Sequence, residues 1–279
     1  MGTDRNNNEV RGFRGLLMTV ELNYEKYDLG NLTWEEAETR IEDTDFVVLP
    51  TGAIEQHSLH LPVSVDTLRA ENLTRILANR APDRDLSMLR LPTLPFGYSE
   101  HHMTRSGTLT LMPDTYQKVI RELGESVAKH GAKRLLIVNC HGGNLSPLKL
   151  AGERLQREHE LKVFLVDWTS YARDQLETRF GEDWSHAGEH ETSVTELFHP
   201  ELVRTEKKEK QCRKAEFNAR QYTWYTDLTV QGGRGDPTNS DPEFMEEVVR
   251  DTTERILDAL EEDLAQPTKG MEQLQPSDE

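Results

Sequence analysis

The sequence predicts an α/β fold in which helices cover both faces of a mostly parallel sheet, giving three layers. Compact apolar runs at residues 46–50 and 135–138 lack polar alternation, which is typical of strands buried on both faces. Helical patterns separate these runs, and parallel strands need such crossover connections. A length of 279 residues is sufficient for one sizeable core.

Capping residues, turn residues and apolar periodicity place the individual helices and strands along the chain. Thr33 and Glu36 form a capping-box pattern that opens a helix to about residue 41, and the strand at 46–50 comes next. The helix after this strand carries Asp66 near its start, and Gly131 marks the end of a later one. We expect further strands at 86–91, 135–138 and 163–166, and further helices at 114–130, 144–158, 191–197 and 243–264.

The chain is predicted to form one domain. Residues 16–265 carry all the periodic patterns, and they contain no repeat and no linker between domains. Residues 1–15 and 266–279 are polar and have few side chains to bury, so both ends are expected to be flexible.

Charge and composition exclude several classes of partner. The chain has 33 Lys and Arg against 50 Asp and Glu, a net charge of −17, which disfavours nucleic acid and anionic membranes. No apolar run reaches the roughly 18 residues of a membrane helix, and no signal peptide is recognisable, so a cytoplasmic location is expected. Cys140 and Cys212 are too few for a disulfide framework. The excess of carboxylates also suggests a salt-loving host.

Imidazoles and carboxylates gather where the predicted strands end. Ligands of such sheets bind beyond the carboxyl ends of the strands. Three segments reach that edge, and together they carry Glu55, His57, Asp66, His141, His186 and Glu189. Such nitrogen and oxygen donors, without a thiolate cluster, suit Zn²⁺, Mn²⁺ or Fe²⁺.

Other interpretations of these residues remain open. Gly142 and Gly143 are compatible with an ordinary strand-to-helix turn capped by Asn144. Cys140, beside His141, could be a thiol nucleophile, although neighbouring residues of a strand end face opposite sides.

A second alternative is an inverted zinc protease. His186, Glu189 and His190 match the H-x-x-E-H pattern of these enzymes. That pattern requires a helix, and Gly188 argues against one starting before it.

Three longer segments resemble the creatininase (creatinine amidohydrolase) family. They are LPTGAIEQH at 49–57, HGAKRLLIVNCHGGN at 130–144 and HAGEHETS at 186–193. The resemblance covers about residues 30–260 and implies a three-layer α/β/α fold, a dinuclear metal site and a homohexamer. It also implies hydrolysis of a non-peptide C–N bond, in a cyclic amide or formamide, of a small-molecule substrate.

The resemblance also assigns metal ligands, residue by residue. Glu55, Asp66 and His141 would hold one of two divalent ions, of zinc, manganese or iron, and His57 and Asp66 the other. Members that hydrolyse creatinine carry a further carboxylate ligand at the position of Gly143. We therefore expect Glu189 to replace that ligand here.

The remaining assignments concern catalysis and substrate. His186 matches the catalytic histidine of the family, and Glu191 matches a recurring acidic position beside the site. Trp168 would cover the substrate, and the backbone of Gly142 and Gly143 would pass close to it. In the mechanism that follows, two ions activate water and polarise the carbonyl, and His186 gives a proton to the departing nitrogen.

The substrate is left open by the sequence. The absent carboxylate at Gly143 argues against creatinine itself. An archaeal-type formamidopyrimidine-nucleotide deformylase of flavin and deazaflavin synthesis is an alternative, for which Arg105 could bind a phosphate. A metal-binding protein without catalytic activity is a further alternative.

Overall fold

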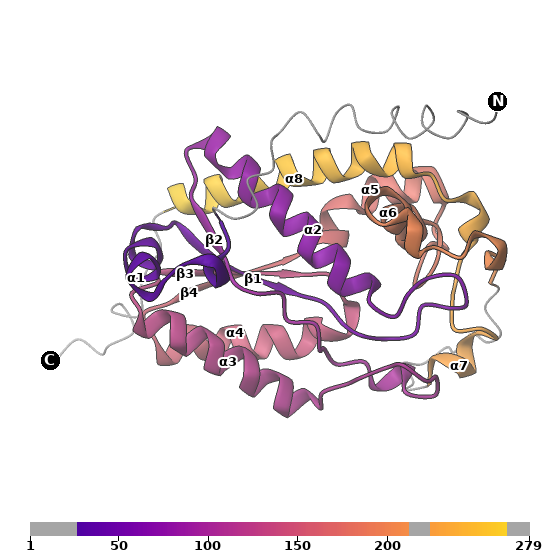
Figure 1. Cartoon of the computed structure of the whole chain (residues 1–279), viewed down its shortest axis with the longest axis horizontal. Helices are drawn as coiled ribbons and strands as arrows, with labels where there is room; N and C mark the ends of the chain where they lie inside the picture. Colours follow the sequence, from indigo (N-terminus) through magenta and orange to yellow (C-terminus); the bar gives the residue numbers. More distant parts are fainter. Residues whose placement is uncertain (1–26, 212–223, 267–279) are drawn as a thin grey trace, which may run out of the picture.

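The computed structural model describes residues 27–211 and 224–266, which form a parallel sheet between layers of helices (Figure 1). The strand order is β2-β1-β3-β4. The strands are β1 (Phe46–Thr51), β2 (Met88–Arg90), β3 (Arg134–Asn139) and β4 (Lys162–Asp167). Of the ends predicted to be flexible, residues 1–15 and all of 266–279 except Gln266 lie outside the described residues, and so does Cys212.

Helices cover both faces of the sheet, so the predicted three-layer α/β/α fold is confirmed. Figure 1 shows α3 and α4 below the sheet and α2 and α8 above it. The helices are α1 (Trp34–Asp43), α2 (Val65–Arg80), α3 (Pro113–Lys129), α4 (Leu145–Glu158), α5 (Trp168–Phe180), α6 (Glu189–Phe198), α7 (Tyr225–Leu228) and α8 (Pro242–Ala265).

Alternate residues of the central strands enter two different cores. Val47 and Leu49 of β1 pack with side chains of α3 and α4 on one face. Phe46 and Val48, one residue out of phase, pack with α2 and α8 on the other. Burial on both faces explains why the strand is apolar throughout, since each such side chain contributes roughly 1.5–3 kcal/mol when removed from water.

The order of the strands creates a crevice at one end of the sheet. The chain leaves β1 through α2 to reach β2 on one side, then returns through α3 to β3 on the other side of β1. Val47 of β1 pairs with Leu135 of β3, and Phe46 pairs with Met88 of β2. The connections after β1 and β3 therefore diverge, which is where open α/β sheets bind their ligands.

Several elements differ in extent from the prediction. The capping box of α1 is present, since Thr33 Oγ1 accepts from Glu36 N–H and the Glu36 carboxylate accepts from Thr33 N–H at 2.7 Å. β2 is shorter than expected, and β4 lies at the sheet edge with Leu165 exposed. Helix α5, which follows β4 directly, was not predicted.

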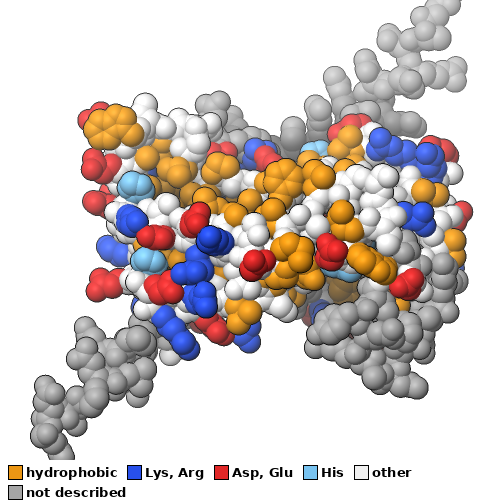
Figure 2. All heavy atoms as spheres, turned by 90° about the horizontal axis from the view of Figure 1, so that it is seen from below, with side chains coloured by type: hydrophobic (Ala, Val, Ile, Leu, Met, Phe, Trp, Pro, Cys, Tyr) orange, Lys and Arg blue, Asp and Glu red, His pale blue; other side chains and the backbone are white. Residues whose placement is uncertain are grey.

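The surface mixes charge and apolar side chains. Figure 2 shows basic and acidic groups interspersed with hydrophobic ones on the face seen from below. Leu109 and Met112 are among the exposed apolar residues. Within 27–211 and 224–266, no helix has the length and apolar character to cross a membrane.

Candidate active site

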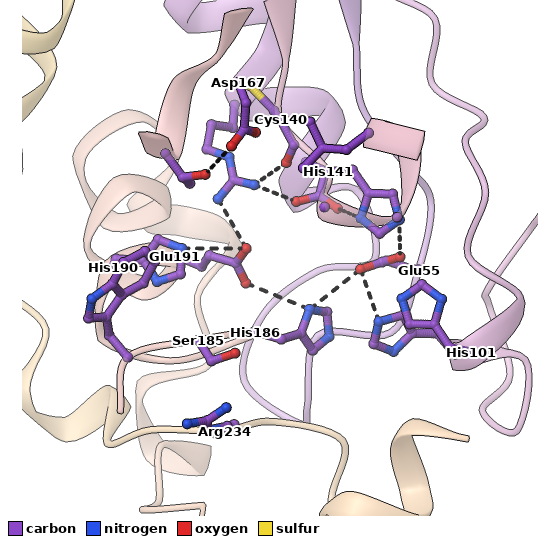
Figure 3. A pocket seen from close by; sticks show the side chains of 18 of the residues that line it. Glu55, His101, Cys140, His141, Asp167, Ser185, His186, His190, Glu191 and Arg234 are labelled. Atoms are coloured by element: carbon purple, nitrogen blue, oxygen red, sulfur yellow. Dashed lines mark hydrogen bonds and ion pairs between the residues drawn. The ribbon is translucent and has the colours of Figure 1, made fainter. Parts of the chain in front are cut away.

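The three segments selected from the sequence meet in the crevice beyond β1 and β3 (Figure 3). Glu55 and His57 lie in the loop after β1, and Asp66 lies in the first turn of α2. His141 follows β3, and Glu191 lies in the first turn of α6. All five side chains are buried, and all of them except His57 line a cavity of about 510 Å³.

Gly52 allows this convergence. A Cβ built on Gly52 would lie 2.6 Å from the backbone of Thr67 and 2.8 Å from the carbonyl carbon of Asp66. A side chain there would push the start of α2 away from the end of β1. Because Gly52 has no side chain, α2 starts close to the end of β1 and the Asp66 carboxylate can reach the other two segments.

Two imidazoles each lie between two carboxylates. His57 Nε2 is 3.3 Å from Glu191 Oε2 and 3.6 Å from Asp66 Oδ1. His141 Nδ1 is 3.2 Å from Asp66 Oδ2, and its Nε2 is 3.3 Å from Glu55 Oε2. Asp66 is therefore shared by the two imidazoles, in the central position that the resemblance assigned to it.

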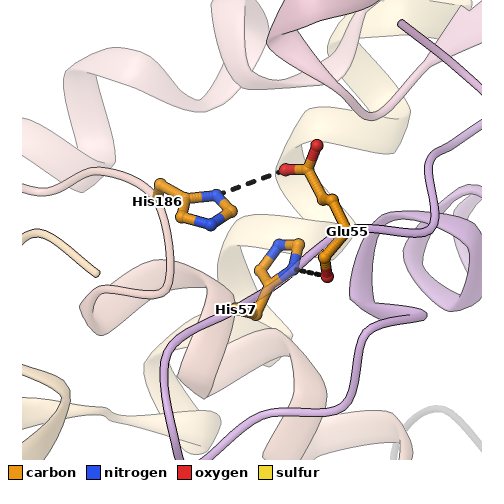
Figure 4. Close-up of side chains that lie close together, drawn as sticks. All are labelled: Glu55, His57 and His186. Carbon is orange, nitrogen blue, oxygen red and sulfur yellow. Dashed lines mark hydrogen bonds and ion pairs between the residues drawn. The ribbon is translucent and has the colours of Figure 1, made fainter. Parts of the chain in front are cut away.

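Hydrogen bonds to carbonyl oxygens orient these rings. A carbonyl oxygen can only accept, so His57 Nδ1 donates to Glu55 O at 3.1 Å (Figure 4), and His141 Nε2 donates to Tyr98 O at 3.0 Å. Nε2 of His57 then faces Asp66 and Glu191. Nδ1 of His141 faces Asp66, while its Nε2 also lies 3.3 Å from Glu55 Oε2. This arrangement is typical of histidine ligands, whose second nitrogen is fixed by a backbone carbonyl.

Arg69 holds the two carboxylates from behind. Its Nη2 donates to Asp66 Oδ1 at 2.8 Å, and its Nη1 donates to Glu191 Oε1 at 3.0 Å. Nη2 also donates to the carbonyl oxygen of Cys140. The guanidinium is buried, and it occupies one oxygen of each carboxylate while the other faces the cluster. Arg69 was not predicted as a site residue, although its spacing of three residues from Asp66 places both on one face of α2.

Burial and mutual contact set the protonation of the cluster. Burial raises the pKa of Glu55 to about 7. Burial alone would lower the pKa of His141, but Glu55 and Asp66 raise it to about 9. Burial likewise opposes the charge of His57, yet Glu191 and Asp66 hold its pKa well above the usual value. Cationic imidazoles thus offset the carboxylates in this structure.

His186 presents an unprotonated nitrogen to the cluster. Its Nε2 donates to Gln56 O at 2.6 Å, so in the neutral ring Nδ1 carries the lone pair. Nδ1 lies 3.4 Å from Glu55 Oε1 (Figure 4) and 3.9 Å from Glu191 Oε2 (Figure 3). Burial and the neighbouring His57 lower the pKa of His186 to about 3, so the ring is neutral near pH 7.

The donor atoms form three groups that could hold a metal ion. The groups are Glu55 with His57 and His186, Glu55 with His101 and His141, and His57 with Asp66 and Glu191. Both carboxylate oxygens of Glu55, Asp66 Oδ2 and His57 Nε2 are buried without a hydrogen-bond partner among the described residues. Unsatisfied buried donors and acceptors of this kind fit a site for hard or borderline divalent ions.

Glu189 lies outside this cluster, unlike the prediction. Its Oε1 accepts from Asp236 N–H at 2.7 Å, and its side chain faces Gly235 in a separate cavity of about 440 Å³. None of the three groups of described residues includes it. Helix α6 starts at Glu189, and side chains two positions apart on a helix point about 200° apart. Glu191 therefore reaches His57 in its place.

Trp168 is also placed away from the cavity. Its side chain is 1% exposed and packs in the core between α5 and α8, with the Arg69 guanidinium 5.3 Å from the ring centroid. The aromatic side chain at the cavity is Trp184. No role was predicted for Trp184, because no helix was expected after β4 to separate the two tryptophans.

The two alternative chemistries find little support in the geometry. Gly188 is the N-cap of α6, so His186 precedes the helix that carries His190, and the H-x-x-E-H residues do not share a helix face. Burial raises the pKa of the Cys140 thiol to about 12, which leaves it protonated. Asn144 does not cap α4 through its side chain, which instead binds Tyr98 N–H and Gly52 O.

Gly142 and Gly143 both line the cavity, but only Gly143 is tightly enclosed. A Cβ on Gly143 would lie 2.3 Å from Tyr98 O and 2.4 Å from His141 Nε2, whereas a Cβ on Gly142 would meet nothing within 4 Å. We expect Gly143→Ala to lower the free energy of unfolding by about 1–3 kcal/mol and to weaken metal binding by displacing His141. Gly142→Ala is the matched control and should be close to neutral. Urea unfolding and metal titration measure both; equal behaviour of the two variants would contradict the argument.

Comparisons with known proteins agree with this geometry. The family model described as Creatininase (Creatinine amidohydrolase) matches residues 30–260. The creatinine amidohydrolase of Pseudomonas putida is 32% identical over 198 residues, 63% of this chain and 73% of that protein. A mycofactocin precursor peptide peptidase of Mycobacterium tuberculosis is 34% identical over 166 residues, 58% of this chain and 61% of that protein.

Solved structures resemble the chain over most of its length. A crystal structure of creatinine amidohydrolase (creatininase) has a TM-score of 0.75 at 25% identity and covers 87% of this chain and 99% of its own. Two further relatives, at 24% and 23% identity and a TM-score of 0.75, are described as a manganese form and a zinc form of creatininase.

Proposed function

Because the chain belongs to the creatininase family and is therefore a hydrolase of amide C–N bonds, we propose that it is a dinuclear metal-dependent amidohydrolase of a small molecule. The observation that carries this proposal is the buried set of His57, Asp66 and Glu191, whose donor atoms lie within 4.8 Å of one another. Burying carboxylates and imidazoles together costs free energy, and bound metal ions would offset that cost. The cluster also lies at a topological switch point, where sheets of this kind bind their ligands.

The described side chains fit two neighbouring ions. We assign His57, Asp66 and Glu191 to one position, and Glu55 and His141 to the other, with Asp66 between them. His101 groups with Glu55 and His141 and is a candidate for the same position. Glu191 replaces Glu189 in this assignment. Divalent ions held there would lower the pKa of a water molecule and polarise the amide carbonyl.

His186 is assigned the proton transfers. Its Nδ1 lone pair faces the cluster and its Nε2 is tied to Gln56 O. Nδ1 would accept the proton that the attacking water loses and return it to the departing nitrogen, so that amide and water become a carboxylic acid and an amine, and the acid then gives its proton to the amine or to solvent. The low pKa of the ring leaves Nδ1 unprotonated near pH 7.

The C–N bond that we propose is hydrolysed belongs to a cyclic amide or a formamide. A formamidopyrimidine nucleotide is the alternative substrate, although Arg105, suggested for its phosphate, is exposed and donates to Val230 O rather than lining the cavity. A screen of zinc-loaded and manganese-loaded protein against creatinine, formamidopyrimidines and cyclic ureides tests this. Metal-dependent hydrolysis of one of them is expected, and metal-loaded protein inert toward all amides tested would count against it.

Asp66→Asn tests the shared position. We expect about two equivalents of zinc or manganese per chain in the wild type and loss of both in the variant, because Asp66 contributes to each position. Asp114→Asn, an exposed aspartate in the first turn of α3, is the control and should retain both ions. The readout is metal content after gel filtration. Full occupancy in Asp66→Asn would remove the bridging assignment.

A further inference from the structure

The cavity extends well beyond the reacting centre. Its volume of about 510 Å³ falls in the range of about 300–1,000 Å³ that holds a drug-sized ligand. Glu55 and His141 line its inner end, and Trp184, Arg173 and Arg234 also line it. Figure 3 shows Arg234 beyond Ser185, on the side away from Glu55 and His141. A single cyclic amide at the inner end would leave this outer part unfilled.

A stack of side chains joins the outer part to the cluster. The Arg173 guanidinium lies 5.6 Å from the centroid of the Trp184 ring. The Trp184 ring meets His190 edge-on with centroids 4.7 Å apart, and His190 Nε2 is 3.7 Å from Glu191 Oε1. A guanidinium held over an indole face keeps its N–H groups in a defined plane, which prepares it for a planar anion.

Arg234 is tied to the catalytic segment. Its backbone N–H donates to the carbonyl oxygen of His186 at 2.8 Å. Its Nη2 donates to Asp183 at 2.9 Å, but the Asp183 side chain is 93% exposed. The ion pair of Arg173 with Glu177, at 3.2 Å, is likewise exposed. Such exposed pairs contribute little, so an anionic ligand could take over either guanidinium at small cost.

Two acidic side chains, Asp167 and Glu182, line the same cavity, and neither forms an ion pair with Arg173 or Arg234 among the described residues. The Asp167 carboxylate already accepts from Thr169 Oγ1 at 2.9 Å and from Asn139 Nδ2 at 3.5 Å. Glu182, at the cavity wall, is exposed. Arg173 and Arg234 come from different segments and line one cavity, and unlike Arg69, which binds two buried carboxylates, they are paired within the described ranges only with exposed ones.

We propose that the substrate carries an anionic group, a carboxylate or a phosphate, bound by Arg173 and Arg234 against Trp184. This inference rests on the proposed function only in placing the reacting amide at the inner end of the cavity. It identifies the substrate class as amides with a negatively charged arm, larger than a neutral cyclic amide.

Three benzamides test the charge directly. Hippurate, hippuramide and N-benzoyl-O-phosphoethanolamine share one amide and differ in carrying a carboxylate, no charge or a phosphate. Calorimetry with zinc-loaded wild-type protein is expected to give at least about tenfold tighter binding of an anionic probe than of hippuramide. The tighter of the two anionic probes identifies the preferred group.

The arginine variants separate this subsite from direct binding to the metal. Arg173→Gln combined with Arg234→Gln should remove the preference for anions while metal content stays unchanged. Arg157→Gln, on the exposed surface of α4, should keep it. A preference that survives the double variant, equal affinity for all three probes, or no binding of either anion at millimolar concentration would each overturn the proposal. Arginine-dependent binding by a protein that hydrolyses no amide would instead support the subsite and reject the proposed function.

Discussion

Replacing His186 with alanine is expected to lower turnover about 10²- to 10⁴-fold while metal content stays at the wild-type level. The reason is the position of Nδ1, which faces Glu55 and Glu191 with its lone pair because Nε2 is bound to Gln56 O. No other neutral imidazole of the cavity combines a donor bond to a backbone carbonyl with this approach to both carboxylates among the described residues. Steady-state kinetics on the substrate identified by the screen, together with metal analysis, measures both effects.

The same variant distinguishes two roles for His186. His186 also groups with Glu55 and His57 as a possible ligand, so loss of one ion in His186→Ala would make it a ligand rather than the proton carrier. His130→Ala, at the exposed end of α3, is the control and should leave turnover and metal content unchanged. Wild-type turnover in His186→Ala would reject both roles.

The sequence was sufficient to predict the sheet and most of the cluster. The buried runs of β1 and β3 are apolar throughout because both faces of these strands pack against helices, and that pattern is visible without coordinates. The parallel arrangement then requires their following loops to share one edge. Glu55, His57 and His141 could be selected for that reason alone.

Side-chain direction could not be predicted with the same certainty. Glu189 and Glu191 lie two positions apart, and which of them faces the cluster depends on where α6 begins. The helix starts at Glu189 because Gly188 has an extended backbone at the N-cap. An error of one or two residues in a helix start is enough to exchange the two carboxylates.

Contacts between segments that are distant in the sequence could not be predicted either. Arg69 contacts Glu191 of α6 and the carbonyl of Cys140 after β3, and neither contact follows from its position in α2. Trp184 and Arg234 reach the cavity from irregular segments, which have no periodicity to orient them. Together with Arg173 of α5, the packing of these segments defines the outer part of the cavity.

Arg69→Met should produce the largest loss of stability among the substitutions considered, about 3–5 kcal/mol in the metal-free protein. Methionine fills much of the same volume but leaves Asp66 and Glu191 without the buried cation that binds one oxygen of each. Zinc should reduce the loss, because divalent ions at the same carboxylates offset their charge. Urea unfolding with and without zinc measures the difference.

Arg80→Met on the same helix is the control, since the Arg80 side chain is 40% exposed and its pairs with Asp83 and Glu254 contribute at most about 1 kcal/mol. Equal destabilisation by the two variants would show that the Arg69 guanidinium does not hold the cluster together.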